Sequence, residues 1–316
     1  MGAVGFQEAT WIWKDGEYVG WHDCQVHLLA TAVQFGTSVF EGMRAYETPR
    51  GPAIFRLDAH IERLIDSAKI YRMVPDYTAE QLSEVCQDIV RKNELRNCYI
   101  RPMILRGYGT PGLNPTLSPI ETYIAAWGWG TYLGEDALNK GVDVCVSSWQ
   151  RMAPNTFPAR AKAGGHYVNA QLMKMEAVQN GYVDAIALGP SGLVSEGSGM
   201  NLFLVDDGVV ISPVLDGTSL VGITRGAVIQ MAKDLGYEVV EKPVPREALY
   251  TVDEMFFTGT AAEVTPVSSV DRITIGEGVA GPITRAIQAR FLETVRGEND
   301  DPHGYLTVVE EAAVTA

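Results

Sequence analysis

The sequence predicts an α+β (mixed α/β) fold with two domains. The chain has 316 residues, which is long enough for two cores of ordinary size. Segments with strand composition and segments with helical periodicity intermix without strict alternation. Residues 127–134 alternate glycines with aromatics and hold neither period, which is typical of a linker. We therefore expect a small N-terminal domain over 1–127, an interdomain loop over 128–135 and a large C-terminal domain over 136–316 that carries Lys162.

The N-terminal half begins with a predicted hairpin. Strand-like residues 11–13 and 18–19 flank Asp15-Gly16, a strong pair for a tight turn. Further strands are expected over 38–46, 53–56, 99–105 and 121–127. Two helices are also predicted, because apolar residues recur at helical spacing. These residues are Ile61, Leu64, Ile65 and Ala68 in the first helix, and Leu82, Val85, Cys86, Ile89 and Val90 in the second.

The C-terminal half predicts strands over 142–147, 185–188, 202–205 and 255–257. A helix begins near Tyr167 and carries the apolar residues Leu172, Met175 and Val178. A second helix opens at 222–224 and ends at Gly236, a residue type that commonly terminates helices. A third helix is expected over 283–295.

The composition excludes several classes of protein. The formal net charge of −14 argues against nucleic acid as a partner, because phosphate binding needs clustered Lys and Arg. We expect no membrane span and no secretory signal, because neither a long apolar run nor a basic start followed by one is present. The cysteines form no close pair and the histidines are scattered, so no metal site is expected and a reducing cytoplasm is the simplest location. The cysteines are Cys24, Cys86, Cys98 and Cys145.

Residues 107–112 match a dinucleotide-binding fingerprint letter by letter. That fingerprint must open a helix whose N-terminus meets the pyrophosphate. Pro111 lies inside the match and Asn114-Pro115 follow it, so no helix can begin there comfortably. We interpret the segment as a loop, and an assay of NAD binding would test the alternative of a nucleotide-binding module.

Lys162 is the first candidate catalytic residue. It lies between Ala161 and Ala163 and is followed by Gly164-Gly165, just before a predicted helix. Small neighbours let a flat ring approach the amine, and a lysine in such a pocket can lose its proton and attack an aldehyde. Taken alone, the same segment also fits a solvated lysine in a turn.

Three segments of the C-terminal half could accompany this lysine. Glu196 lies among glycines between two strands, where a carboxylate could hold a proton on a ring nitrogen. The helix that opens at Gly222 would direct free backbone N–H groups toward an anion. The turn that begins at Gly259 leaves its amides unobstructed, which suits a phosphate or a carboxylate. Alone, these segments equally fit a surface turn, an unliganded helix start and a plain hairpin.

Two sites in the N-terminal half could bind anions. Tyr99 and Arg101 point to the same face of a predicted strand, where a phenol and a guanidinium could grip a carboxylate. Arg63, on the first predicted helix, could hold a phosphate. The alternatives are a surface pair on a half-exposed strand and an arginine that faces water.

In combination and in this order, the segments resemble the class IV (fold type IV) pyridoxal phosphate transaminases, and within them the branched-chain amino acid transaminases. The resemblance runs from about residue 11 to about residue 297. The segments that carry it are 35–42, 60–64, 99–102, 161–165, 195–201, 222–225 and 259–263.

The resemblance implies a role for each candidate residue. Lys162 would form the internal aldimine with pyridoxal 5'-phosphate and then shuttle a proton between the substrate and the cofactor. Glu196 would pair with the pyridine nitrogen, Tyr167 would bind the phenolic oxygen, and Leu220 would pack on the ring. The phosphate would be held by Arg63, Gly222, Ile223, Thr224, Gly259 and Thr260. The substrate would be bound by Phe40, Gly42, Tyr99, Arg101, Trp129, Tyr132, Thr260 and Ala261.

The implied activity is exchange of an amino group between L-leucine, L-isoleucine or L-valine and 2-oxoglutarate. The implied assembly is a homodimer or a homohexamer built as a trimer of dimers. Phe35 and His166 stand where many relatives have Tyr and Asn, which leaves activity on D-amino acids or (R)-amines as an alternative. Aminodeoxychorismate lyase is a second alternative, and a catalytically silent scaffold is a third that the Lys162 and Glu196 residues argue against.

Overall fold

The computed structural model describes residues 6–130, 138 and 140–310, and its contacts divide the chain into two units. Unit 1 comprises 1–130, 161–165 and 293–316, and unit 2 comprises 131–160 and 166–292. The mixed fold class is confirmed. The segment with Lys162 groups with unit 1 in these contacts, and the expected domain limits stay a prediction. The reason is local: the backbone of Lys162 is hydrogen-bonded to Phe40 and Ser67.

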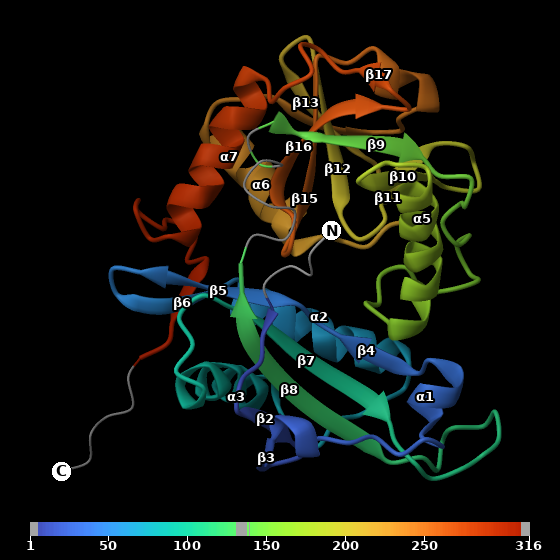
Figure 1. Cartoon of the computed structure of the whole chain (residues 1–316), viewed down its shortest axis with the longest axis vertical. Coiled ribbons are helices and arrows are strands. Elements are labelled where there is room, and N and C mark those ends of the chain that lie inside the picture. The colour runs from blue at the N-terminus through green and yellow to red at the C-terminus, as the bar shows by residue number, and fades with distance from the viewer. Residues whose placement is uncertain (1–5, 131–137, 139, 311–316) are drawn as a thin grey trace. The chain divides into compact units, whose positions relative to one another are not determined.

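Unit 1 is built on an antiparallel sheet (Figure 1). Among the described residues the strand order is β18-β6-β5-β7-β8-β2-β3, with β1 paired to β8 and β4 paired to β7. The hairpin around Asp15-Gly16 is confirmed, and both turn residues have positive φ. The strands are β1 (Phe6–Gln7), β2 (Trp11–Lys14), β3 (Glu17–Gly20), β4 (Ser38–Phe40), β5 (Met43–Thr48), β6 (Gly51–Phe55), β7 (Cys98–Arg106), β8 (Ile120–Trp129) and β18 (Leu306–Val308).

Helices α2 (Leu57–Ile70) and α3 (Ala79–Lys92) cover one face of this sheet (Figure 1). Thr78 begins α3 with a capping box, in which Gln81 returns the hydrogen bond. The apolar residues predicted for both helices pack on alternate strand residues, among them Ile100 and Ile124. The intervening residues of β7 and β8 therefore face the other side, and Tyr99, Arg101, Trp127 and Trp129 are among them.

Unit 2 contains a mixed sheet with the order β11-β10-β9-β16-β15-β12-β13-β14 in the described residues, and β17 pairs with β16. Three of its pairings, β9–β10, β9–β16 and β13–β14, are parallel. The strands are β9 (Val142–Val146), β10 (Asp184–Leu188), β11 (Val194–Gly197), β12 (Asn201–Asp206), β13 (Val209–Pro213), β14 (Val239–Lys242), β15 (Glu254–Gly259), β16 (Glu263–Val270) and β17 (Ile273–Thr274).

The helices α5 (Tyr167–Gln179), α6 (Ile223–Asp234) and α7 (Pro282–Val295) lie close to their predicted positions. Helix α5 buries a different face from the apolar residues named above. Met175 and Val178 are exposed, whereas Met173 and Ala177 pack on alanines of β10. Small side chains allow the helix to approach the sheet closely, and this close packing determines which face is buried.

Two loop expectations have different outcomes. Residues 107–112 form bends with no helix, as expected, because β7 ends at Arg106. Residues 127–129, which we assigned to the linker, instead continue strand β8. They pair with Cys98 and Tyr99 of β7 and with β1, and this long-range pairing outweighs their glycine content. The alternating pattern of aromatic residues reflects one face of a strand.

Candidate active site

The segment that carries Lys162 lies along strand β4 in unit 1. Phe40 N–H donates to the Lys162 carbonyl at 3.0 Å, and Lys162 N–H donates to Ser67 Oγ at 3.0 Å. A Cβ on Gly164 would lie 2.4 Å from Ser38 Oγ, so a larger residue would have to displace that hydroxyl. The small residues around Lys162 thus let its backbone reach the strand. The Lys162 amine lies 5.4 Å from the centroid of the Phe40 ring.

Arg63 is held by a buried acid on the chain between β4 and β5. Its Nε donates to Glu41 Oε1 at 2.6 Å and its Nη2 donates to Oε2 at 2.9 Å. His60, one helical turn before Arg63, lies 2.7 Å from the same carboxylate through Nδ1. Glu41 and His60 are almost fully buried, while the Arg63 side chain remains slightly exposed. This arrangement fixes the direction of the guanidinium.

The protonation of this cluster follows from its burial. Burial alone would raise the pKa of Glu41, but the charges and hydrogen bonds of Arg63 and His60 hold that pKa well below its usual range. Burial lowers the pKa of His60, and the nearby carboxylate of Glu41 only partly opposes this effect. We therefore treat the contact between His60 and Glu41 as a hydrogen bond from a neutral imidazole to a carboxylate.

Tyr99 and Arg101 come together with Phe40, Gly42 and Trp129. The Tyr99 ring stacks on Trp129 with centroids 4.8 Å apart, and Arg101 Nη2 donates to Tyr99 Oη at 3.3 Å. The Arg101 guanidinium also lies over the Phe40 ring. A Cβ on Gly42 would lie 1.7 Å from Tyr99 Oη, so only glycine leaves room for the phenol. The predicted substrate residues of unit 1 are thus contiguous.

Glu196 lies on β11 of unit 2 and is buried. Arg151 Nη2 lies 2.8 Å from its Oε1, and both side chains are less than one-tenth exposed. Arg151 also donates to Asn169 Oδ1 at 3.1 Å, and Asn169 donates to the Gln150 carbonyl at 3.0 Å. The carboxylate is therefore anchored to the first turn of α5.

Asn201 joins the predicted segments of unit 2. Its Nδ2 donates to Glu196 Oε2 at 3.3 Å and to the Leu220 carbonyl at 3.0 Å. Leu220 N–H in turn donates to Glu196 Oε2 at 3.2 Å. A Cβ on Gly222 would lie 1.8 Å from Asn201 Oδ1, so this glycine permits the close approach. The side-chain amide of Asn201 thus lies among Glu196, Leu220 and the start of α6.

The start of α6 and the turn after β15 provide donors for an anion. Gly222 is the N-cap residue of α6 and has no side chain that could accept a hydrogen bond. The first backbone N–H groups of the helix, including those of Ile223 and Thr224, therefore have no side-chain acceptor at this cap. Gly259 lies beside Met200 and is followed by Thr260 and Ala261, which are half-buried. The neighbouring Thr258 Oγ1 is buried and has no hydrogen-bond partner among the described residues. The backbone amides at the start of α6 and in the turn after β15 fit a phosphate group. Glu196 fits the ring nitrogen of a cofactor that carries such a phosphate.

The remaining predicted residues have simpler positions. Tyr167 begins α5 in unit 2. His166 precedes it and is buried, with its ring edge-on to Phe157 at 5.2 Å. Phe35 ends the short helix α1 (Thr31–Phe35) and is about half exposed. Tyr132 lies outside the described residues.

Sequence reasoning missed the partners that hold the site together. Arg151, Asn201, Glu41 and His60 received no role, although the last three lie within the segments that carried the resemblance. A lone charged residue beside a strand or a helix face gives no local sign of its partner. The pairs of Glu41 with Arg63 and of Arg151 with Glu196 join residues that lie far apart in the sequence.

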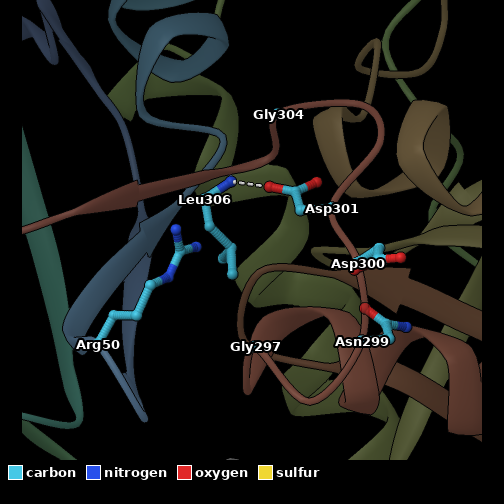
Figure 2. A pocket seen from close by; sticks show the side chains of 7 residues that line it. All are labelled: Arg50, Gly297, Asn299, Asp300, Asp301, Gly304 and Leu306. Atoms are coloured by element: carbon cyan, nitrogen blue, oxygen red, sulfur yellow. Dashed lines mark hydrogen bonds between the residues drawn. The ribbon is translucent and has the colours of Figure 1, made fainter.

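A cavity of about 420 Å³ in unit 1 is a separate feature (Figure 2). Its lining contains none of the predicted site residues. Arg50, from the turn between β5 and β6, faces the segment that follows α7. The carboxylate of Asp301 accepts backbone hydrogen bonds from Tyr305 and Leu306 at 2.9 and 2.8 Å, so it stabilises a turn.

Comparison with known proteins shows the family. The model of amino-transferase class IV matches residues 38–270. A branched-chain-amino-acid aminotransferase of Escherichia coli is 48% identical over 306 residues, covering 96% of this chain and 99% of that protein. The crystal structure of an Escherichia coli branched-chain amino acid aminotransferase has a TM-score of 0.94, with 49% identity and 96% and 100% of the two chains covered. The Thermobaculum terrenum branched-chain amino acid aminotransferase in its PLP form has a TM-score of 0.90, with 34% identity and 96% and 99% covered. This chain therefore belongs to the class IV aminotransferases.

Proposed function

We propose that this chain is a pyridoxal phosphate-dependent branched-chain amino acid aminotransferase. It exchanges the amino group between L-leucine, L-isoleucine or L-valine and 2-oxoglutarate. The observation that carries the proposal is the cluster around Asn201, where an anchored carboxylate, Glu196, lies beside the uncapped start of α6. The relatives named above catalyse this class of reaction, according to their names, and match nearly the full chain.

The residues predicted from the sequence would hold the cofactor as follows. Glu196 would face the pyridine nitrogen, and Leu220 would pack on the ring. Arg63, the amides of Ile223 and Thr224, and Thr260 after Gly259 would bind the phosphate. Tyr167 would bind the phenolic oxygen. When bound, pyridoxal phosphate supplies the aldehyde that takes up the amino group and a ring that delocalises the electrons of the broken Cα–H bond.

Lys162 would carry the proton that moves during the reaction. Its amine is a base that could take the proton from the substrate α-carbon and deliver it to the C4′ atom of the cofactor. The hydrogen bonds of its backbone to Phe40 and Ser67 hold the main chain at a defined place, so the amine has a restricted reach. Such positioning lowers the entropic cost of the proton transfer.

The substrate would bind against the aromatic face of β7 and β8. Phe40 and Trp129 offer apolar surface for a branched side chain, and Gly42 leaves room for Tyr99. Arg101 offers a cation to the second carboxylate of glutamate or 2-oxoglutarate. Thr260 and Ala261 would bind the α-carboxylate through their amides.

An absorbance scan of the purified holoenzyme tests this function. We expect a visible band that bleaches when L-leucine is added and returns with 2-oxoglutarate. Lys162→Ala should retain cofactor binding by dialysis but lose the leucine-dependent bleaching. D-leucine and an (R)-amine are tested in the same assay, because Phe35 and His166 leave activity on such compounds as an alternative. Absence of a band after reconstitution, or a band that L-leucine leaves unchanged, would disprove the proposal.

We also propose that the chain assembles as a homodimer or a homohexamer. The support is an exposed apolar patch in unit 1, contributed by two segments that contact each other. His27 stacks on Tyr108 at 4.1 Å, and Thr31 Oγ1 lies 2.9 Å from Ser118 Oγ. A patch of this kind marks interaction surfaces in soluble proteins. Its exposed members are Val26, Leu28, Leu29, Val33, Phe35, Tyr108, Leu113 and Leu117.

Light scattering coupled to size exclusion measures this assembly. Replacement of Leu28 and Leu113 by Glu should dissociate the assembly, whereas the same change at Val279, an exposed residue of unit 2, should leave it intact. A wild-type chain that elutes as a monomer at micromolar concentration contradicts this proposal.

We further propose a cytoplasmic location. The four cysteines are unpaired in the structure, and Cys86 and Cys98 are fully buried. Unpaired thiols are typical of reducing compartments. Among the described residues, no helix is both long enough and apolar enough to cross a bilayer. Fractionation of the source cells would test the location.

A further inference from the structure

Arg101 is surrounded by aromatic rings and has no acidic partner among the described residues. Its guanidinium carbon lies 4.7 Å from the centroid of the Phe40 ring, 5.1 Å from that of Tyr99 and 5.7 Å from that of Trp127. The hydrogen bond to Tyr99 Oη is its only polar side-chain contact in the described part of the chain, and its Nε is buried without an acceptor. We call these three rings the Arg101 cage.

Trp127 is the member of the cage that sequence analysis gave no role. It lies opposite Tyr99 in the pairing of β7 with β8, on the face that carries Arg101. Its ring stacks on Tyr99 with centroids 5.0 Å apart and planes 29° apart, and Phe6 packs on it at 5.9 Å. Trp127 is only 9% exposed, so the side chains around it limit its movement. It therefore restrains both Tyr99 and Arg101.

The cage has a different effect on Arg101 from that of an acid. An acidic partner would balance the guanidinium charge, as Glu41 does for Arg63. Aromatic rings attract a cation through their quadrupole and leave its net charge intact. A caged arginine can therefore still bind an incoming carboxylate.

We propose that Trp127 is a specificity-determining residue, which positions Arg101 and Tyr99 so that the enzyme binds the side-chain carboxylate of a dicarboxylic substrate. It acts through its ring and through Arg101, and contributes little to the binding of leucine. The inference rests on the proposed function, because it concerns the glutamate and 2-oxoglutarate arm of that reaction. It adds a positioning residue to the roles proposed above.

The test compares two substrates in variants of the holoenzyme. Trp127→Met and Trp127→Leu both remove the ring. Two variants are used so that the comparison can still be made if one of them does not fold. We expect each to raise KM for L-glutamate by about tenfold, while KM for L-leucine and kcat for both substrates change by less than about twofold. Trp127→Phe retains a ring and should keep the wild-type ratio of the two KM values within about threefold. Trp149→Leu, at an exposed tryptophan of unit 2, is the matched control.

A double-mutant cycle separates positioning from general packing. If Trp127 acts through Arg101, then Trp127→Leu added to Arg101→Met should change the glutamate-to-leucine ratio no further. An equal loss of both substrates in the tryptophan variants, or a Phe variant that behaves like the Leu variant, would overturn the inference. A wild-type enzyme that transaminates neither substrate would instead overturn the proposed function.

Discussion

Arg63 grips both carboxylate oxygens of Glu41, with Nε 2.6 Å from Oε1 and Nη2 2.9 Å from Oε2. Glu41 is fully buried, and His60 contacts the same carboxylate. A buried charge left without its partner is strongly destabilising, because desolvation is then uncompensated. If Arg63 binds the phosphate as proposed, Glu41 orients it without contacting the ligand, and this relationship leads to the first prediction.

Glu41→Gln should lower the free energy of unfolding of the cofactor-free protein by about 3 kcal/mol, because it leaves the Arg63 charge without its buried partner. Urea denaturation measures this change. Glu47→Gln is the matched control, because Glu47 pairs with Arg96 at 2.8 Å on the surface and both side chains are about half exposed. Glu47→Gln should lower the free energy of unfolding by less than about 1 kcal/mol. Equal losses in the two variants would contradict the assigned role of Glu41.

His60 should make stability depend on pH. Burial lowers its pKa in the folded state, so the unfolded chain binds a proton more readily than the folded chain does. The stabilisation from this group is therefore complete above the unfolded value of about 6.5 and decreases as the pH falls below it. Urea midpoints between pH 8 and pH 5 measure the decrease.

His60→Asn should flatten this dependence, because an amide can donate to Glu41 but does not titrate. His22→Asn, at a highly exposed histidine, is the control and should retain the wild-type slope. If His60→Asn kept the full slope between pH 7 and pH 5, the acid sensitivity would have another origin.

Arg151 should control the binding of the cofactor through Glu196, to which it is paired at 2.8 Å. Arg151→Met leaves the carboxylate without its main cation, so we expect the dissociation constant of pyridoxal phosphate to rise at least about tenfold. The pH dependence of the visible band should shift as well, since Glu196 then changes its charge or its position. Arg151→Lys should restore part of the affinity.

The control for Arg151 is Arg246→Met, which breaks an exposed pair with Asp271 at 3.1 Å. It should leave the affinity for the cofactor unchanged. An Arg151→Met protein that binds the cofactor as tightly as the wild type, with the same spectral pH profile, would show that Arg151 has no positioning role.

Gly222→Ala should impair phosphate binding, because the new Cβ would lie 1.8 Å from Asn201 Oδ1 and displace the amide from Glu196 and Leu220. We expect weaker binding of pyridoxal phosphate, measured by equilibrium dialysis. Gly226→Ala, on the same helix, meets no atom within 4 Å of its Cβ and serves as the control. It should bind normally and gain up to about 1 kcal/mol of stability from helix propensity. Identical affinities of the two variants would refute the cradle at Gly222.

Local pattern in the sequence was sufficient to predict several of the elements, whereas β13, β14 and β16 were not predicted. The Asp15-Gly16 hairpin, helices α2, α3 and α6, and the loop at 107–112 depend on turn chemistry and on period, which act between close neighbours. The order of the segments was also sufficient to predict the family, because each segment carries a residue type that the chemistry needs. Lys162, Glu196 and Arg101 were named on that basis.

Only the tertiary structure decided how these residues are held. It showed that β8 continues through Trp127, that α5 buries Met173 rather than Met175, and that Lys162 packs on β4. It also paired Glu41 with Arg63 and Arg151 with Glu196. The physical reason is that burial and ion pairing are set by contacts between residues far apart in the chain, whereas the period of a segment records only which of its own residues share a face.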